Sequence, residues 1–88
     1  MTGRLSPIDD IVADLRTFFA PVTAGHVPGP DEDYFAVGLV NSLLALELVA
    51  HVERRFGITV EVEDLDLDNF RTMHRTAEFV RRKRSAQS

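Results

Sequence analysis

The chain has 88 residues, a formal net charge of −4 and no cysteine, and 44% of its residues are hydrophobic. This size and apolar content predict a single domain over residues 1–88, built around one hydrophobic core. The lack of cysteine excludes a disulfide framework, a thiolate nucleophile and a cysteine zinc site. No stretch is apolar over the length that a signal peptide or a membrane span needs, so we expect a cytoplasmic protein without a membrane partner.

The charge is distributed unevenly along the chain. Residues 1–80 hold all 14 acidic residues and six basic ones, a net charge of −8, whereas residues 81–84 are all basic. An acidic body repels nucleic acid and favours basic protein partners. The basic run, in a C-terminal tail over residues 81–88, is a weak nucleic-acid signal. We interpret it as cations that complement the negative end of a helix dipole.

A first helix is expected over about residues 6–20, in the stretch SPIDDIVADLRTFFA. Ser6 can cap it, Pro7 suits its first position, and two aspartates follow in its first turn. We expect Pro21 to end this helix. Apolar residues recur every three or four positions and predict its core face: Ile8, Ile11, Val12, Leu15 and Phe19.

A long connection without periodicity follows over residues 20–40, with several prolines and glycines. Such a long connection in a small domain is usually functional or specially anchored. Phe35 and Leu39 are the expected anchors, because each would otherwise expose apolar area to water.

A second helix is expected from Ser42 to Phe56, with Gly57 as its C-terminal stop. At about 100° per residue, its core face collects Ala45, Leu48, Val49, Val52 and Phe56. Leu43 and Leu46 lie on the opposite side, where a solvent-exposed face would normally be polar. They predict a docking patch, unless the long loop or a short helix covers them.

The stretch ITVEVEDLDLDNF gives a mixed signal. Ile58, Val60 and Val62 alternate like a strand, but a single short strand would have nothing to pair with. We therefore expect an extended connection and then a short irregular helix over residues 63–69.

Thr72 is expected to open the last helix, with its inward residues Met73, Ala77 and Val80 and with Phe79 at the margin. The predicted fold class is therefore all-α: a bundle of three main helices and one short helix, with a long first loop.

Ser42 stands at the start of the second helix and could act as a cap, a nucleophile or an attachment point. A serine nucleophile needs a neighbouring base. His51 lies more than two turns further along the same helix, His26 would have to approach from the loop, and His74 lies on another helix. The G-x-S-x-G elbow of hydrolases is also missing. We predict no catalytic residue and no enzymatic activity.

No metal site is predicted either. His51, Glu47 and Arg55 share a stripe on the second helix, which we interpret as a solvated i, i+4 contact. The stretch DLDLDN resembles part of a calcium loop but lacks the glycine and the distant glutamate. We interpret it as solvated acidic surface.

The remaining role for Ser42 is to carry a covalent group. A phosphodiester on its hydroxyl would be favoured by the free N–H groups and the dipole at the helix N-terminus. Asn41, directly before it, is a good N-cap. The outer face of the helix next to Ser42 carries the candidate docking residues Leu43, Leu46, Glu47, Ala50 and Arg54, with Glu53 at its flank.

Several short motifs follow one another in this region: Gly38-Leu39, Ser42-Leu43, Glu47-Leu48 and Phe56-Gly57-Ile58. Acyl carrier proteins share this order, with G-[LIV]-D-S-L, an amphipathic helix that contains a Glu-Leu pair, and then FGI. The chain resembles an acyl carrier protein over about residues 6–80, the expected core of the domain.

This resemblance implies a four-helix bundle of the acyl-carrier type, with 4′-phosphopantetheine on Ser42. A phosphopantetheinyl transferase would add this arm, and its thiol would hold an acyl or aminoacyl group as a thioester. Partner enzymes would dock at Leu43, Leu46, Glu47, Ala50 and Glu53. The expected partners are acyl-loading and acyl-modifying enzymes, including a dehydrogenase and a polyketide synthase acyltransferase, and the carrier itself is expected to be a monomer.

Two departures from the family pattern bear on which acyl group, or cargo, the carrier would hold. Asn41 replaces the usual aspartate, and the form GLVNS resembles stand-alone carriers of polyketide extender units of the hydroxymalonyl or methoxymalonyl type. Leu44 and Arg54 occupy positions that are often acidic in fatty-acid carriers. These features favour polyketide or related secondary metabolism over fatty-acid synthesis.

Three alternatives stay open at this point. One is a peptidyl or aminoacyl carrier of a nonribosomal peptide pathway, and another is an unmodified acidic helical interaction module. The third is a helix-turn-helix DNA-binding protein that uses RTMHRTAEFVRRKR, which conflicts with the acidic body.

Overall fold

The computed structural model describes residues 7–23, 25, 27–36, 38 and 40–87, apart from the side chains of residues 7, 22, 42 and 87. Within this part the chain forms helices and no strand: α1 (Pro7–Val22), α2 (Ser42–Phe56), the 3-10 turn η1 (Val62–Asp64), α3 (Leu67–Phe70) and α4 (Met73–Gln87). The predicted all-α fold is confirmed. Ser6, His26 and Leu39 lie outside the described residues.

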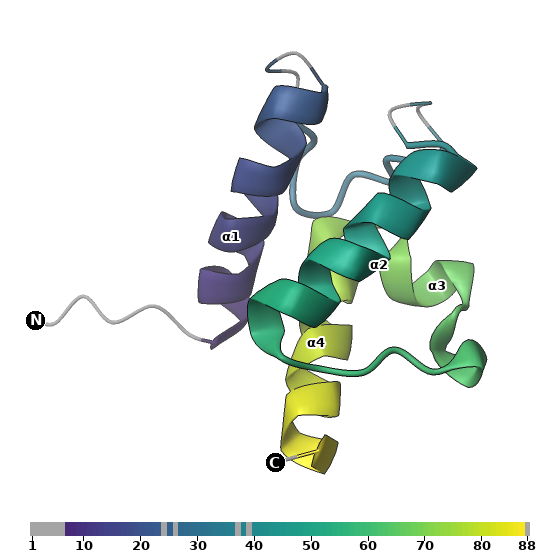
Figure 1. Ribbon diagram of the computed structural model, residues 1–88. Coiled ribbons are helices and arrows are strands. Elements are labelled where there is room, and N and C mark those ends of the chain that lie inside the picture. The colour runs from purple at the N-terminus through teal and green to yellow at the C-terminus, as the bar shows by residue number, and fades with distance from the viewer. Residues whose placement is uncertain (1–6, 24, 26, 37, 39, 88) are drawn as a thin grey trace, which may run out of the picture.

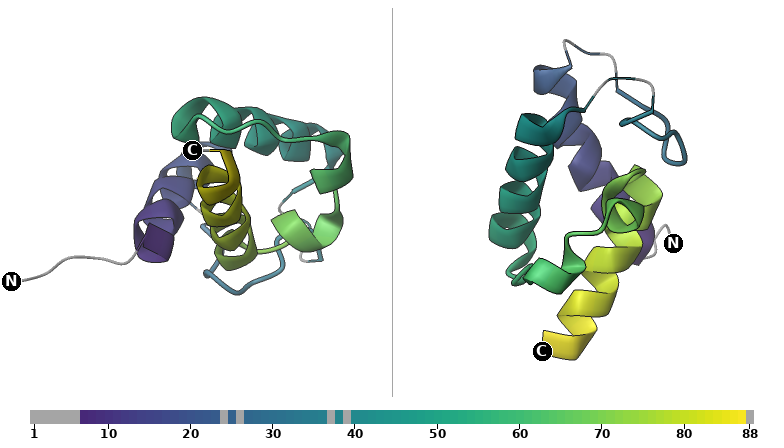
Figure 2. Two further views of the ribbon diagram at one scale, coloured as in Figure 1. Left: turned by 90° about the horizontal axis from the view of Figure 1, so that it is seen from below. Right: turned by 90° about the vertical axis from the view of Figure 1, so that its right-hand side faces the viewer.

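The three long helices surround one core (Figure 1). α1 and the short α3 both pack against α4, and α2 lies across α1 and α4, as the left view of Figure 2 shows. The connection after α2 passes along the bundle to η1 and α3, so these two short elements lie beside α2 as well. This arrangement places the start of α2 and the 62–70 segment at the same edge of the molecule.

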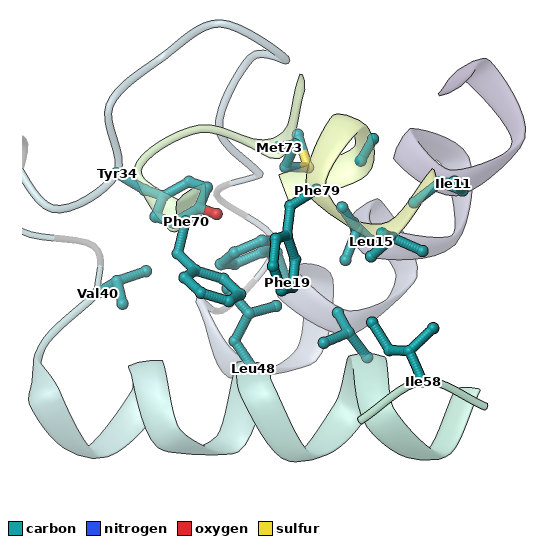
Figure 3. Packing of buried hydrophobic residues seen from close by; sticks show 13 residues of the cluster. Ile11, Leu15, Phe19, Tyr34, Val40, Leu48, Ile58, Phe70, Met73 and Phe79 are labelled. Atoms are coloured by element: carbon teal, nitrogen blue, oxygen red, sulfur yellow. The ribbon is translucent and has the colours of Figure 1, made fainter. Parts of the chain in front are cut away.

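The predicted stripes supply most of the buried core, and Figure 3 shows their side chains pointing to a common centre. Full burial of one such aliphatic or aromatic side chain contributes about 1.5–3 kcal/mol relative to exposure. The buried residues from the stripes are Ile11, Leu15, Phe19, Leu48, Val52, Met73, Ala77 and Val80. Half-buried residues at their edges are Ile8, Val12, Ala45, Val49 and Phe56.

The prediction that Pro21 ends the first helix is wrong, because α1 continues through it to Val22. Proline removes only the hydrogen bond of its own missing N–H, a small loss in a last turn. The backbone N–H of Thr23 still donates to Phe19 O at 2.9 Å. The stop comes at Gly25, whose φ of 84° is left-handed and whose N–H donates to Ala20 O at 2.7 Å.

The expected single short helix over residues 63–69 is also wrong, because two separate elements stand there. η1 ends at Asp64, and Asp66 is extended, with φ −112° and ψ 132°. The Asp66 carboxylate accepts the backbone N–H of Asp68 at 2.9 Å and so caps α3. This local hydrogen bond competes with a continuous helix, as aspartate commonly does.

Phe79 is in the core and not at its margin, since only 1% of its surface is exposed. α3 covers this side of α4, and the rings of Phe70 and Phe79 lie 5.1 Å apart. The interpretation of the basic run as the end of a helix is confirmed, because residues 81–84 lie in α4. Thr72 caps that helix, with its hydroxyl accepting the backbone N–H of Arg75 at 3.0 Å.

The long loop is anchored by the expected Phe35 and by further residues that the sequence did not indicate. Phe35 packs against the core but is only half-buried. Tyr34 and Val40 are buried, with 0% and 5% of their surfaces exposed, and Pro28 is buried too. A tyrosine can be buried here because its hydroxyl finds a partner in Thr76, at 2.9 Å.

Candidate functional site

The start of α2 is organised by Asn41. Its backbone is extended, with φ −112° and ψ −175°, and its side-chain oxygen accepts the N–H of Leu44 at 2.9 Å. Its carbonyl accepts the N–H of Ala45 at 2.8 Å, the first hydrogen bond of the helix. Asn41 is thus the N-cap, and Ser42 is the first residue of α2, with its side chain outside the described part.

This helix end favours an anionic group. The first N–H groups of any α-helix lack acceptors within the helix, and the macrodipole is positive at this end. The first turn of α2 contains no acidic residue that would repel an anion. Asn41 caps without adding a negative charge. The backbone geometry and the charge here are therefore compatible with a phosphodiester on residue 42.

An apolar groove begins beside position 42. Its volume is about 360 Å³, and it is lined by Phe35, Ala45, Leu46, Val49, Leu65, Asp66, Leu67 and Phe70. The three lining residues from α2 follow Ser42 by three, four and seven positions, so they share a helix stripe with it. The opposite wall comes from the α3 region. Position 42 thus stands at the end of a groove between α2 and α3.

Two of the candidate docking residues are strongly exposed leucines. Leu43 and Leu46 have 67% and 63% of their surfaces exposed, so neither the long loop nor α3 covers them. Glu47 and Arg54 are exposed too, whereas Ala50 is half-buried. Three further apolar residues near α3 are also exposed: Val62, Leu65 and Leu67.

Glu53 has an intramolecular partner. Its carboxylate accepts the backbone N–H of Val60 at 2.9 Å, and the side chain is half-buried. This bond fixes the connection that leads from α2 to η1. Glu53 therefore differs from Glu47, which has no hydrogen bond or ion pair to another described residue.

The interpretation of His51, Glu47 and Arg55 as a solvated stripe holds for the exposed Glu47 and Arg55 but is wrong for His51, which is half-buried. Asp14 of α1 lies 3.0 Å from His51 Nε2 and accepts from Arg55 Nε at 2.6 Å. The His51 ring also packs at a tilt against the Phe18 ring, with the ring centroids 4.9 Å apart. These contacts join α2 to α1, and the Asp14 carboxylate raises the pKa of Arg55. No local sequence signal pointed to Asp14, because its partners are 37 and 41 residues away.

Two further candidate residues, His74 and Asp68 of the DLDLDN stretch, have ion-pair partners. His74 Nδ1 lies 3.1 Å from Asp31, and Asp68 lies 3.2 Å from Arg71. The described part of the chain contains no group of three or more residues that could hold a metal ion. No described helix is long and apolar enough to cross a membrane.

A family model for the phosphopantetheine attachment site matches residues 11–80. The chain belongs to the phosphopantetheine-binding carrier family. Its covalent cofactor is therefore 4′-phosphopantetheine, and proteins of this family interact with phosphopantetheinyl transferases and acyl-handling enzymes. The matched region includes the first residue of α2 and the whole groove.

Similar curated proteins are D-alanyl carrier proteins. One from Bacillus velezensis is 42% identical over 43 residues, which cover 49% of this chain and 55% of that protein. Those of Streptococcus sanguinis and Streptococcus mutans are 36% and 34% identical over 56 residues, or 64% of this chain and 71% of each relative. The chain thus matches little more than half the length of the Bacillus relative.

Proposed function

We propose that this carrier uses Ser42 as its attachment residue and has no catalytic activity of its own. The arm's thiol then holds an acyl group as a thioester while partner enzymes act on it. The observation that carries this proposal is the position of Ser42. It is the first residue of a capped helix inside the matched attachment-site region, beside an apolar groove.

In the attachment step, a new phosphoester bond to Ser42 replaces the phosphoanhydride bond of coenzyme A. The hydroxyl oxygen of Ser42 forms a bond to the pantetheine phosphorus of coenzyme A, and the phosphoanhydride bond of that donor breaks. The nucleotide leaves, and the serine proton passes to a base of the transferase. The positive end of α2 then faces the new phosphodiester, which retains one negative charge.

Partner enzymes are proposed to dock on the outer face of α2. Leu43 and Leu46 offer exposed apolar area, and Glu47 offers a charge with no partner among the described residues. Ala50 follows about one helical turn further along α2, and its small side chain allows a close approach. Glu53 contributes less to this surface, because its carboxylate is already bound to Val60.

For the cargo, our first candidate is a small acyl unit of a polyketide extender pathway. This candidate is supported by the GLVNS form of the attachment motif and by the uncharged or basic residues at Leu44 and Arg54. The second candidate is an aminoacyl group. It is supported by the similarity to D-alanyl carrier proteins, which extends over 64% of this chain in the streptococcal cases.

Co-expression with a broad-specificity phosphopantetheinyl transferase tests the attachment. The intact protein should gain the mass of one phosphopantetheinyl group, and the Ser42→Ala variant should gain none. Asn41 can still cap α2 in this variant, so its circular dichroism spectrum should be unchanged. Modification of Ser42→Ala at another residue contradicts the proposed site. A protein that stays unmodified supports the unmodified interaction module instead.

Loading assays on the modified protein then separate the two cargo candidates. Acyltransferases that use malonyl-type thioesters are compared with ligases that activate amino acids as adenylates. Acylation by the first class alone supports the polyketide role, and aminoacylation alone supports the second candidate.

A further inference from the structure

Tyr34 links α4 to the segment just before α2. Its backbone N–H donates to the carbonyl of Arg71 at 3.1 Å, and its carbonyl accepts the N–H of Val40 at 3.0 Å. Its hydroxyl lies 2.9 Å from the hydroxyl of Thr76. Figure 3 shows Tyr34 and Val40 reaching from the loop toward the core above Leu48. Tyr34 thus connects the end of α3, at Arg71, and α4, at Thr76, with a residue only two positions before Ser42.

The direction of the hydroxyl contact follows from the donor inventory. The Thr76 hydroxyl has one hydrogen, which it donates to the Thr72 carbonyl at 2.9 Å. The Tyr34 hydroxyl must therefore donate to Thr76 Oγ1. Burial raises the pKa of the Tyr34 hydroxyl, so it keeps this proton. The Tyr34 ring is fixed as well, with its centroid 4.8 Å from Phe19 and 5.6 Å from Phe35.

The two ends of α2 are held by different contacts. Its C-terminal half is tied to α1 through Asp14 and to the following connection through Glu53. Near its N-terminal end, Leu44, Ala45 and Leu48 pack on the core, and the corresponding polar tie within the described residues is the hydrogen bond from Val40 N–H to Tyr34 O. The position of residue 42 therefore depends on Tyr34 more than on the packing of the opposite end of the helix.

We propose that Tyr34 is a positioning residue for the modification of this carrier. Through its own bonds to Arg71 and to Thr76 of α4, it ties Val40 to the bundle and so sets the location of the first turn of α2. Its neighbour Phe35 lines the groove, so one anchor aligns the groove wall and the attachment end of α2. This inference rests on the proposed attachment at Ser42.

Two substitutions remove the Tyr34–Thr76 hydrogen bond from opposite sides, and a third retains it. Tyr34→Phe keeps the buried ring, Thr76→Val leaves the tyrosine O–H without an acceptor, and Thr76→Ser keeps the acceptor. Hydrogen exchange of the Val40 amide and kcat/KM for the transferase with coenzyme A are measured well below the melting temperature. We expect about fivefold faster exchange and about fivefold lower kcat/KM in Tyr34→Phe, the factor for one hydrogen bond of ~1 kcal/mol.

Thr76→Val should change the Val40 exchange rate and kcat/KM more than Tyr34→Phe does. Thr76→Ser should leave both quantities as they are in the unaltered protein. Asp14→Ala is the matched control, because it loosens the other end of α2. It should lower stability without changing Val40 exchange or kcat/KM. The proposal is overturned if Tyr34→Phe and Thr76→Val leave both quantities unchanged, or if Asp14→Ala changes them equally.

The exchange measurement does not require modification, so it separates this inference from the proposed function. An unaltered protein that is never modified at Ser42 defeats the proposed function, whatever the Val40 amide does. Normal modification of Ser42 combined with unchanged Val40 exchange in Tyr34→Phe and Thr76→Val defeats only the positioning role. If Tyr34→Phe does not fold, the comparison of Thr76→Val with Thr76→Ser tests the positioning role in its place.

Discussion

Lys83 Nζ lies 2.6 Å from Asp64 Oδ2, and this ion pair joins the end of α4 to η1. The same carboxylate oxygen accepts the backbone N–H of Glu61 at 3.0 Å. Both side chains of the pair are mostly buried, with 18% of Lys83 and 21% of Asp64 exposed. The pair therefore fixes the segment whose next residues, Leu65 to Leu67, line the groove.

This ion pair predicts a loss of stability in acid. The Lys83 ammonium, followed by the Glu61 N–H, lowers the pKa of Asp64 in the folded protein. The stabilisation is complete above the ordinary aspartate pKa of about 3.9 and is lost as the pH falls through the lower folded value. Asp64→Asn should lower the free energy of unfolding by up to about 1 kcal/mol at neutral pH and by much less in strong acid. Thermal melts over a pH series measure this.

The control for that prediction is Glu78→Gln, at an exposed position of α4. It should melt like the unaltered protein at neutral pH. A constant deficit of Asp64→Asn at every pH would show that the lost stability comes from local packing and not from the charge.

Asn41 predicts a charge effect that depends on modification. Asn and Asp rank about equally as caps, but Asp adds a negative charge at the positive helix end, worth roughly 0.3–1 kcal/mol. Asn41→Asp should therefore stabilise the unmodified protein slightly and lose part of this gain once Ser42 carries a phosphodiester. Melts before and after modification measure the difference. If Asn41→Asp abolishes modification, Asn41 is a recognition element for the transferase and more than a cap.

Glu47 is the sharpest test of the docking face. Glu47→Lys should slow loading by partner enzymes and leave the melting temperature nearly unchanged, because surface substitutions usually shift stability by less than about 0.5 kcal/mol. Added salt should slow loading of the unaltered carrier, since exposed charges are screened over ~8 Å at physiological ionic strength. If neither added salt nor Glu47→Lys changes the loading rate, the contact with the partner enzymes is mainly apolar, through Leu43 and Leu46.

Glu53 should behave differently from Glu47. Glu53→Ala removes the acceptor of the Val60 N–H, so we expect a loss of about 1 kcal/mol in the free energy of unfolding. Denaturant melts of Glu53→Ala and Glu47→Ala side by side measure it. Equal stability of the two variants, with a loading defect in Glu53→Ala alone, would restore Glu53 as a docking residue.

The core stripes could be predicted because helix periodicity is a local property. Spacings of three and four residues placed Leu15, Leu48 and Val80 on inward faces, and all three are fully buried. Cap chemistry is local too, so Asn41 and Thr72 could be assigned to helix starts from their neighbours alone. The predicted end of the first helix at Pro21 was wrong for a related reason. Whether the missing N–H of a proline ends a helix depends on the other hydrogen bonds of the last turn.

Tertiary structure decided the features that depend on distant residues. Tyr34 is the only tyrosine of the chain and precedes a phenylalanine in a loop, a weak sign of an anchor. Its partner Thr76 is 42 residues away, and no local pattern joins the two. The pairing of Asp14 with His51 and Arg55, and the burial of Phe79 beneath α3, also depend on how the helices cross.

The sequence by itself determined the all-helical fold and the capped start of the second helix, because each depends on neighbouring residues. It also indicated the carrier family, because the family's motifs follow one another in order along the chain. The structure decided how these parts meet. It left Leu43 and Leu46 exposed, committed Glu53 to Val60, and opened a groove between α2 and α3. The physical reason is that exposure and pairing belong to surfaces that form only when segments far apart in the chain pack together.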